Sequence, residues 1–326
     1  MKVLVTREFP EIGLNLLRES GYELTIWNDD AGYTQDEFSR IAADYEAIMC
    51  TGKEKIDRPF LEANPQLKVV SLYSAGFDNV DVPAATEFGL PIGHAPQSMN
   101  RATSDISFGL MIATARNFFQ MHKRLIKGQV GGFKPTADLG QELYGKTLGI
   151  FGLGAIGYEM AIKCKMAYGM KIIYVSRSKK EKAEKELGAV RVDFDRLLSE
   201  SDVISVHSDL NESTFKVFNA EAFGKMKPTS IFINTSRGKV HDEEALAEAL
   251  QSGKIWGAGL DVTDPEPMHA DNPLLDAENV CVLPHIGSAT VEARDEMSRL
   301  AAENIVRFFN SGEMTYCVNP SVLKKP

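Results

Sequence analysis

Gly152-Leu153-Gly154-Ala155-Ile156-Gly157 is the stretch that decides the fold. It follows the apolar run KTLGIFG (146–152) and opens a helical pattern, AIGYEMAIKCKMAYG (155–169), that ends in glycine. A G-x-G-x-x-G turn between a strand and a helix is typical of dinucleotide-binding domains. The first glycine permits a tight turn, the second lets a pyrophosphate approach, and the third lets helix and strand pack closely. We predict that all six residues contact a dinucleotide; the alternative is a plain strand-turn-helix connection.

Strand patterns alternate with helical patterns on both sides of this turn. Short apolar runs typical of strands occupy residues 2–6, 23–27, 45–50 and 67–73 before it, and 171–176, 202–207, 230–235, 257–262 and 279–284 after it. The segment from Asn100 to about Gly128 reads as one long helix, and a final helix is expected from about Ala289 to Asn310. Such alternation predicts parallel sheets covered by helices on both faces. We therefore predict an α/β protein with two doubly wound parallel-sheet domains.

The composition narrows the classes of function. The chain has 326 residues, with 36 Lys and Arg against 45 Asp and Glu, so its net charge is −9. Its length suggests two domains, at ~100–200 residues each, and an acidic chain without a long basic run is not expected to bind nucleic acid. No apolar run approaches the ~18 residues of a membrane span, and MKVLVTREFP (1–10) reads as a strand, not as a signal peptide. Four widely spaced cysteines without zinc spacing favour a reducing cytoplasm and no metal site.

The strand after the glycine turn ends in basic and hydroxyl residues instead of an acid. NAD sites usually place Asp or Glu about 20 residues beyond the turn, where it binds the ribose hydroxyls. Here the strand ends in Ser176-Arg177-Ser178-Lys179-Lys180, and the first acid is Glu181. Arg177, with Ser176 and Ser178, would bind a 2′-phosphate through charge-assisted hydrogen bonds. We predict a preference for NADP(H), with NAD(H) possible; alternatively, these residues only begin a solvated helix.

Three reactive side chains in the second half each follow a different predicted strand: Arg237, Glu266 and His285. In open α/β sheets ligands bind outside the carboxyl ends of the strands, so we expect the three side chains to line one crevice. An imidazole transfers protons near neutral pH, a carboxylate beside it orients the ring, and a guanidinium grips a carboxylate in a fork. The set therefore suits the reduction of a 2-oxoacid by hydride and proton, although each residue taken singly could be an ordinary loop residue.

These residues belong to a longer series of motifs, through which the chain resembles the D-isomer-specific 2-hydroxyacid dehydrogenases, in particular the glyoxylate/hydroxypyruvate reductase branch. The resemblance covers nearly the whole chain. The motifs that carry it are, in order, Ser74-Ala75-Gly76-Phe77-Asp78-Asn79-Val80-Asp81, Ala102-Thr103-Ser104-Asp105, Leu143-Tyr144-Gly145-Lys146-Thr147-Leu148-Gly149-Ile150, the glycine turn, Asn234 to Gly238, Leu260-Asp261-Val262 with Glu266-Pro267, and Pro284-His285-Ile286-Gly287.

The resemblance implies a flavodoxin-like substrate domain, residues 1–98 and 287–326, and an inserted Rossmann dinucleotide-binding domain, residues 99–286, with the active site in the cleft. It implies that Arg237 binds the substrate carboxylate and that His285 is the proton donor, paired with Glu266. The backbone N–H groups of Ala75 and Gly76 would help to hold the carboxylate. The cofactor contacts expected beyond the glycine turn and residues 176–178 are Thr103, His207, Thr235, Asp261, His285 and Gly287. The resemblance also implies a homodimer.

One departure and two alternatives remain. Where many relatives have Pro-Leu-Thr, this chain has His207-Ser208-Asp209-Leu210-Asn211, and Asp209 adds an acid near the place expected for a 2′-phosphate. The predicted reaction is the NAD(P)H-dependent reduction of glyoxylate or hydroxypyruvate to the D-2-hydroxyacid. Within the same family the substrate could instead be a 2-ketoaldonate or pyruvate. In a different class, the fold also serves NAD(H)-binding corepressors that dock partner peptides.

Overall fold

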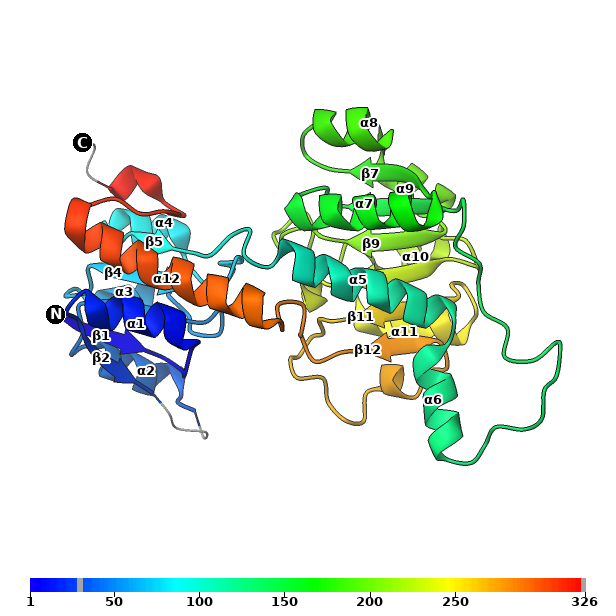
Figure 1. The fold of residues 1–326 in the computed structure, drawn as a ribbon, viewed down its shortest axis with the longest axis horizontal. Coiled ribbons are helices and arrows are strands. Elements are labelled where there is room, and N and C mark those ends of the chain that lie inside the picture. Colours follow the sequence, from blue (N-terminus) through cyan, green and yellow to red (C-terminus); the bar gives the residue numbers. More distant parts are fainter. Residues whose placement is uncertain (28–31, 324–326) are drawn as a thin grey trace. The chain divides into compact units, whose positions relative to one another are not determined.

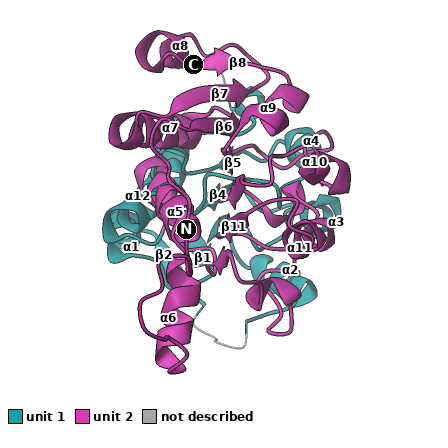
Figure 2. Ribbon diagram, turned by 90° about the vertical axis from the view of Figure 1, so that its right-hand side faces the viewer, with its two compact units in different colours: residues 1–99, 289–326 teal, residues 100–288 magenta. Residues whose placement is uncertain are grey.

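The computed structural model describes residues 1–27 and 32–323. The chain divides into two compact units, residues 1–99 with 289–326 and residues 100–288, which Figure 2 shows in different colours. The second unit is thus inserted into the first, and its limits differ from those predicted from the sequence by one or two residues. Each unit contains its own parallel sheet.

The first unit is built on a parallel sheet whose described strands run in the order β2-β1-β3-β4-β5. Its strands are β1 (Lys2–Val5), β2 (Glu23–Ile26), β3 (Ala47–Cys50), β4 (Val69–Leu72) and β5 (Ile92–Gly93). This is the flavodoxin-like order, so the predicted fold of this unit is confirmed. Every residue of β3 and β4 is buried, as expected of strands covered on both faces.

Helices cover both faces of this sheet. On one face lie α1 (Glu11–Glu19) and α12 (Val291–Ser311), which pack closely against each other at Gly13 and Ser298. On the other face lie α2 (Gln35–Ala42), α3 (Arg58–Ala63) and α4 (Val82–Glu87). Thr34 and Glu37 form a capping box at the start of α2. The sequence pattern missed α4 and β5, because both are too short to show a period.

The second unit has a parallel sheet whose described strands run in the order β12-β11-β10-β9-β6-β7-β8. Figure 1 labels four of these strands, β7, β9, β11 and β12. The strands of this sheet are β6 (Thr147–Phe151), β7 (Lys171–Val175), β8 (Val190–Arg191), β9 (Val203–Val206), β10 (Ile231–Asn234), β11 (Gly257–Leu260) and β12 (Val280–Val282). Numbered from β6, this is the Rossmann order with one further strand, which confirms the prediction. The order reverses between β6 and β9, which places the glycine turn after β6 at the switch point.

Helices again cover both faces of the sheet. One face carries α5 (Asn100–Ala115), α7 (Ala155–Tyr168) and α8 (Glu181–Leu187), and the other carries α9 (Phe194–Glu200), α10 (Ala220–Gly224) and α11 (Glu243–Gln251). The remaining elements are α6 (Phe118–Ile126) and three short 3₁₀ turns, η1 (Gly238–Val240), η2 (Pro273–Leu275) and η3 (Pro320–Val322). No helix in the described ranges is long and apolar enough to cross a membrane.

The single long helix predicted from Asn100 to about Gly128 is wrong. The chain breaks it into α5 and α6 at Asn117, whose φ of 55° lies in the left-handed region. Asn tolerates this conformation better than most residues. The helical pattern of the sequence therefore continues through Asn117, although the helix axis changes direction there. None of the described residues of α6 is buried, although Phe118, Leu125 and Ile126 are large and apolar.

Candidate active site

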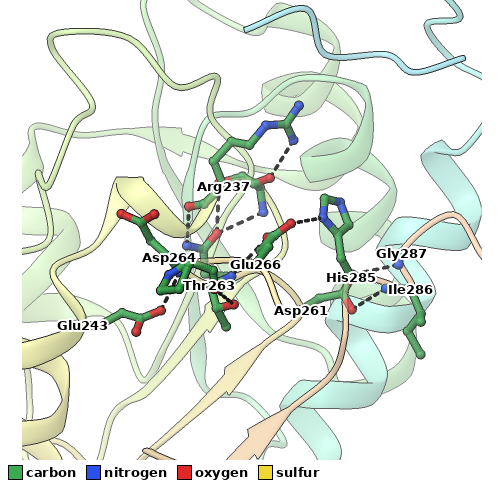
Figure 3. Close-up of polar contacts among 12 residues, drawn as sticks. Arg237, Glu243, Asp261, Thr263, Asp264, Glu266, His285, Ile286 and Gly287 are labelled. Carbon is green, nitrogen blue, oxygen red and sulfur yellow. Dashed lines mark hydrogen bonds and ion pairs between the residues drawn. The ribbon is translucent and has the colours of Figure 1, made fainter. Parts of the chain in front are cut away.

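Three adjacent strands of the second unit, β10, β11 and β12, end at the same edge and carry the three predicted reactive residues. Arg237 follows β10, Glu266 follows β11 and His285 follows β12. Figure 3 shows the Glu266 carboxylate and the His285 ring pointing toward each other, with Arg237 in the same group of residues. The parallel strand order therefore brings together side chains from separate parts of the sequence. The two farthest apart, Arg237 and His285, are separated by 48 positions.

His285 and Glu266 form a hydrogen-bonded pair. Nδ1 of His285 lies 2.8 Å from Oε2 of Glu266, while Oε1 of Glu266 accepts a hydrogen bond from the Thr263 amide at 3.2 Å. Burial raises the pKa of Glu266, but its hydrogen bond with His285, the charges of His285 and Arg237 and the Thr263 amide outweigh burial, so the net pKa lies below the usual value. Glu266 is therefore an anion at neutral pH, and it fixes the orientation of the imidazole.

The backbone at His285 is held by a buried carboxylate. His285 has a φ of 57°, in the left-handed region. Asp261, which is buried after β11, accepts hydrogen bonds from the amides of Ile286 at 2.8 Å and Gly287 at 2.7 Å. Burial raises the pKa of Asp261, while these two amides and the charge of His285 lower it. The sequence predicts a cofactor contact for Asp261; in the structure its two oxygens hold the turn that positions His285.

Replacing Asp261 with Asn is expected to lower the free energy of unfolding by ~1–3 kcal/mol, because one buried amide would then face an NH₂ group. The displaced turn should also reduce turnover. Urea unfolding and steady-state kinetics measure the two effects. The exposed Asp271→Asn is the matched control. Equal stability of the two variants would contradict the assigned role of Asp261.

The turn that carries Arg237 is organised by Asn234, the last residue of β10. Its Nδ2 donates to the Arg237 carbonyl at 2.9 Å, and its Oδ1 accepts from the Ser236 amide and hydroxyl at 2.9 Å. Nδ2 also lies 3.0 Å from Nδ1 of His241, whose pKa burial lowers to about 4, so this ring is a neutral acceptor. The role of Asn234 was missed, although Asn followed two residues later by Ser is a recognisable turn signal.

This turn packs directly on the segment that carries Glu266. A Cβ on Gly238 would lie 2.1 Å from the Thr263 carbonyl oxygen, so only glycine allows the two segments to approach so closely. Arg237 donates from Nη1 to the Ser236 carbonyl at 2.8 Å, and its charge is close enough to lower the pKa of Glu266. Arg237 and Glu266 are thus parts of one packed structure.

Buried hydroxyl groups connect α5 to the same edge. The hydroxyls of Ser107 and Thr235 lie 2.8 Å apart, Ser107 also donates to the Thr103 carbonyl at 3.0 Å, and Thr103 donates to the Gly287 carbonyl at 3.1 Å. Thr103, Thr235 and Gly287 are predicted cofactor contacts, and the structure places all three in this chain of hydrogen bonds. Ser107 was missed because nothing in a helical pattern distinguishes it.

The glycine turn has the geometry that its pattern predicts. Gly152 has a φ of 93°, and a Cβ there would lie 2.6 Å from the Ser208 nitrogen. A Cβ on Gly157 would lie 2.7 Å from the Gly152 carbonyl oxygen. Gly154 differs, because a Cβ there would meet no described atom within 4 Å, and no described side chain caps α7 behind it. The open space and the free N–H groups at this helix start suit a phosphate. Ala155 and Ile156 begin α7, and Leu153 is buried beneath the turn.

Polar atoms near the glycine turn also fit a polar ligand. His207 follows β9, and its Nε2 lies 2.8 Å from the Ser205 hydroxyl. Burial lowers the pKa of His207 to about 3, so the ring is neutral. Its Nδ1 and the Ser208 hydroxyl are buried without a hydrogen-bond partner among the described residues. Buried polar atoms normally have partners, so the site fits a dinucleotide with hydroxyl or phosphate groups.

The predicted 2′-phosphate contacts follow β7. Nη2 of Arg191 donates to the carbonyls of Ser176 at 2.8 Å and Arg177 at 3.1 Å, which fixes the backbone of this segment. The guanidinium of Arg177 is paired with Asp209, Nη2 to Oδ2, at 3.0 Å. Arg177 is thus at the strand end where a ribose is expected, but a carboxylate already contacts it.

The predicted substrate loop lies in the first unit, directly after β4. The Gly76 carbonyl accepts from the Ser74 hydroxyl at 2.7 Å, and the Ala75 carbonyl lies 3.0 Å from Nδ1 of His94. No backbone carbonyl of the described residues accepts a hydrogen bond from the amides of Ala75 and Gly76. Two such amides in a turn with small side chains can bind a carboxylate.

A protein-family model and a curated protein both match this chain. Residues 108–287 match the family model of the D-isomer specific 2-hydroxyacid dehydrogenase, NAD binding domain. The chain is 40% identical over 331 aligned residues to a glyoxylate reductase of Thermococcus onnurineus, covering 100% of this chain and 98% of that protein.

Two solved structures extend the likeness over nearly the whole fold. A glyoxylate reductase from Paecilomyes thermophila matches with a TM-score of 0.87 and 33% identity, over 98% of this chain and 99% of that chain. An NADPH-dependent glyoxylate/hydroxypyruvate reductase from Sinorhizobium meliloti, in complex with NADP and malonate, matches with a TM-score of 0.83 and 31% identity, over 100% and 98%. The sequence, the fold and the paired residues at its strand ends agree: the chain belongs to the D-isomer specific 2-hydroxyacid dehydrogenases, a family of NAD(P)-dependent oxidoreductases.

Proposed function

We propose that this chain reduces a small 2-oxoacid, glyoxylate or hydroxypyruvate, to the D-2-hydroxyacid with NAD(P)H. The observation that carries the proposal is the His285–Glu266 pair, 2.8 Å apart, beside Arg237 at the carboxyl edge of the dinucleotide-binding sheet. The names of the relatives that match over the full length, glyoxylate reductase and glyoxylate/hydroxypyruvate reductase, support the substrate.

The three side chains have separate tasks in the mechanism. The Arg237 guanidinium binds the substrate carboxylate in a fork and keeps the carbonyl in place. When bound, the reduced nicotinamide cofactor supplies the hydride for the carbonyl carbon. His285 donates its proton to the carbonyl oxygen, and Glu266 holds the ring in one orientation through the contact with Nδ1. The amides of Ala75 and Gly76 belong to the first unit, where such a turn can itself bind a carboxylate.

The cofactor contacts of the second unit divide by the part of the dinucleotide that they serve. Gly152 to Gly157 hold the pyrophosphate at the start of α7. We assign the adenosine ribose to Ser176, Arg177, Ser178 and His207, and the nicotinamide side to Thr103, Thr235, Asp261, His285 and Gly287. Arg177 favours NADP(H) over NAD(H), because a guanidinium binds a phosphate more strongly than a hydroxyl. The match to an NADPH-dependent relative supports this preference.

A panel of oxoacids with both reduced cofactors tests the function. Glyoxylate and hydroxypyruvate should give the highest kcat/KM, and NADPH should give a higher value than NADH, followed by nicotinamide absorbance. Faster turnover of pyruvate or a 2-ketoaldonate would replace the substrate but keep the reaction. Retention of a peptide partner without turnover of any oxoacid would instead indicate a corepressor.

Gly154→Ala is expected to weaken NAD(P)H binding roughly tenfold or more, because the methyl group would occupy the space through which the pyrophosphate approaches. The fold should remain intact, since that Cβ meets no described atom within 4 Å. Gly109→Ala, exposed in α5 and equally open, is the control and should bind cofactor normally while gaining ~0.5–1 kcal/mol of stability. Titration of each variant with NADPH measures the affinity, and normal binding by Gly154→Ala would contradict the assigned site.

We further propose that the enzyme is a homodimer that forms through an apolar arm, residues 118–142. The arm comprises α6 and the long loop that follows it in Figure 1. It exposes Phe118, Leu125, Ile126 and Val130, and Phe133 is 94% exposed. Such a concentration of exposed apolar side chains marks an interaction surface. The Gln141 amide anchors the end of the arm to the Ala115 carbonyl at 2.7 Å, so the arm is held in position.

Phe133→Asp should convert the dimer to a monomer, because a carboxylate in an apolar interface is costly to bury. Light scattering or sedimentation measures the mass. Val190→Asp, at an exposed position of the edge strand β8, should leave the dimer intact. A wild-type chain that is monomeric at all concentrations would contradict the proposal. A cytoplasmic location is also proposed, in keeping with the free thiols of Cys50, Cys164, Cys281 and Cys317.

A further inference from the structure

Arg177, which follows β7, is paired with an acid from a different strand. Its Nη2 lies 3.0 Å from Oδ2 of Asp209, which follows β9. In the sheet, β7 and β9 are the two neighbours of β6. The pair therefore joins the segments on either side of the glycine turn, where the adenosine end of a dinucleotide is expected.

The backbones of both residues are fixed, whereas their side chains face solvent. Arg191 binds the Arg177 carbonyl at 3.1 Å, and the Thr214 hydroxyl donates to the Asp209 carbonyl at 2.7 Å. The Arg177 side chain is 88% exposed and that of Asp209 is 76% exposed. An ion pair so exposed contributes little to stability, so a ligand can replace it without disturbing the fold.

We propose that Asp209 sets the choice between the two nicotinamide cofactors. This inference rests on the proposed function and deepens it. A 2′-phosphate at Arg177 would compete with Asp209 for the guanidinium and would be repelled by the carboxylate. A ribose 2′-hydroxyl can instead donate a hydrogen bond to Asp209. Asp209 would then bind the ribose of NAD(H), as the acid at the end of the second strand does in NAD sites. Asp209 thus limits the NADP(H) preference that Arg177 provides, and it keeps NAD(H) usable.

Asp209→Asn tests the inference through binding alone. We expect the affinity for NADPH to rise roughly 3- to 30-fold, since one repelling charge is removed, and the affinity for NADH to stay the same or fall. Both are measured by fluorescence titration of the full chain without an oxoacid. Because the effect is electrostatic between exposed groups, the gain for NADPH should shrink as salt is raised.

The control is Glu200→Gln. Glu200 forms an exposed pair with Arg196, Nε to Oε1 at 2.7 Å, and it ends α9 just before β9 begins, at the opposite edge of the sheet. This variant changes the net charge equally and should leave the ratio of the two affinities unchanged. Arg177→Ala should weaken NADPH binding more than NADH binding.

The outcomes test the role of Asp209 separately from the proposed oxoacid reduction. An unchanged affinity ratio in Asp209→Asn, or an equal change in Glu200→Gln, would overturn the role of Asp209. An Arg177→Ala variant that binds NADPH normally would do the same. A wild-type chain that binds both cofactors but reduces no oxoacid would contradict the proposed function, while the binding ratio would still decide the role of Asp209. A chain that binds neither cofactor would overturn both.

Discussion

His285→Asn is expected to lower kcat by about 10²–10⁴, the contribution typical of a general acid in the active site. Asn is the better replacement at this position, because His285 has a φ of 57° and Asn tolerates the left-handed region more readily than Ala. The backbone amides of Ile286 and Gly287 should keep their hydrogen bonds to Asp261. The loss should therefore come from the missing proton donor and not from a displaced turn.

Cofactor titration distinguishes the loss of the proton donor from a displacement of the turn. NAD(P)H should bind His285→Asn within a few-fold of the normal affinity, and His285→Ala should show the same loss of kcat. His122→Asn, at an exposed histidine of α6, serves as the control and should turn over normally. Wild-type kcat in His285→Asn would show that another group donates the proton.

Arg237→Lys is expected to raise the KM for the oxoacid and to lower kcat, with a combined loss in kcat/KM of about 10²–10³, comparable to the removal of a positioned donor. The charge is kept, but an ammonium group cannot form the two parallel hydrogen bonds of a guanidinium. Arg237 also contributes to the low pKa of Glu266 through its charge, and Lys should preserve this effect. The fold of the turn depends on Asn234 and the Arg237 carbonyl, so it should survive the substitution.

Steady-state kinetics with glyoxylate or hydroxypyruvate measure this loss. Arg196→Lys, on the surface of α9, is the control for a general effect of replacing arginine. If Arg237→Lys kept both constants at the wild-type values, the carboxylate would have to bind elsewhere, and the amides of Ala75 and Gly76 would be the next candidates.

Most strands could be predicted because their signals are local, whereas the two-residue strands β5 and β8 were missed and the strand orders were expected only from the family resemblance. Apolar runs such as 146–152 and 202–207 are short and bounded, and the glycine turn identifies the switch point. The same signals place Arg237, Glu266 and His285 after neighbouring strands, and in the structure the last two form a hydrogen-bonded pair.

Features that depend on contacts distant in the sequence could not be predicted. The helical pattern runs through Asn117 without interruption, and only the backbone conformation shows the break between α5 and α6. Asp261 reads as one more polar residue at a strand end, and its use as an acceptor for two amides 25 and 26 positions later follows from the packing of β11 beside β12. The pairing of Arg177 with Asp209 likewise required the positions of two different strands.

The return of α12 to the first unit has a consequence for the order of folding during synthesis. Val3, Val5 and Val69 on one face of the first sheet are buried together with Ala301 and Ile305 of α12. On the ribosome, that face stays without this cover until residues 291–311 have been translated, whereas residues 100–288 are complete earlier. Domains generally fold as units as they emerge, so we expect the inserted unit to mature first, and the nascent N-terminal sheet to be the segment that most needs protection by chaperones.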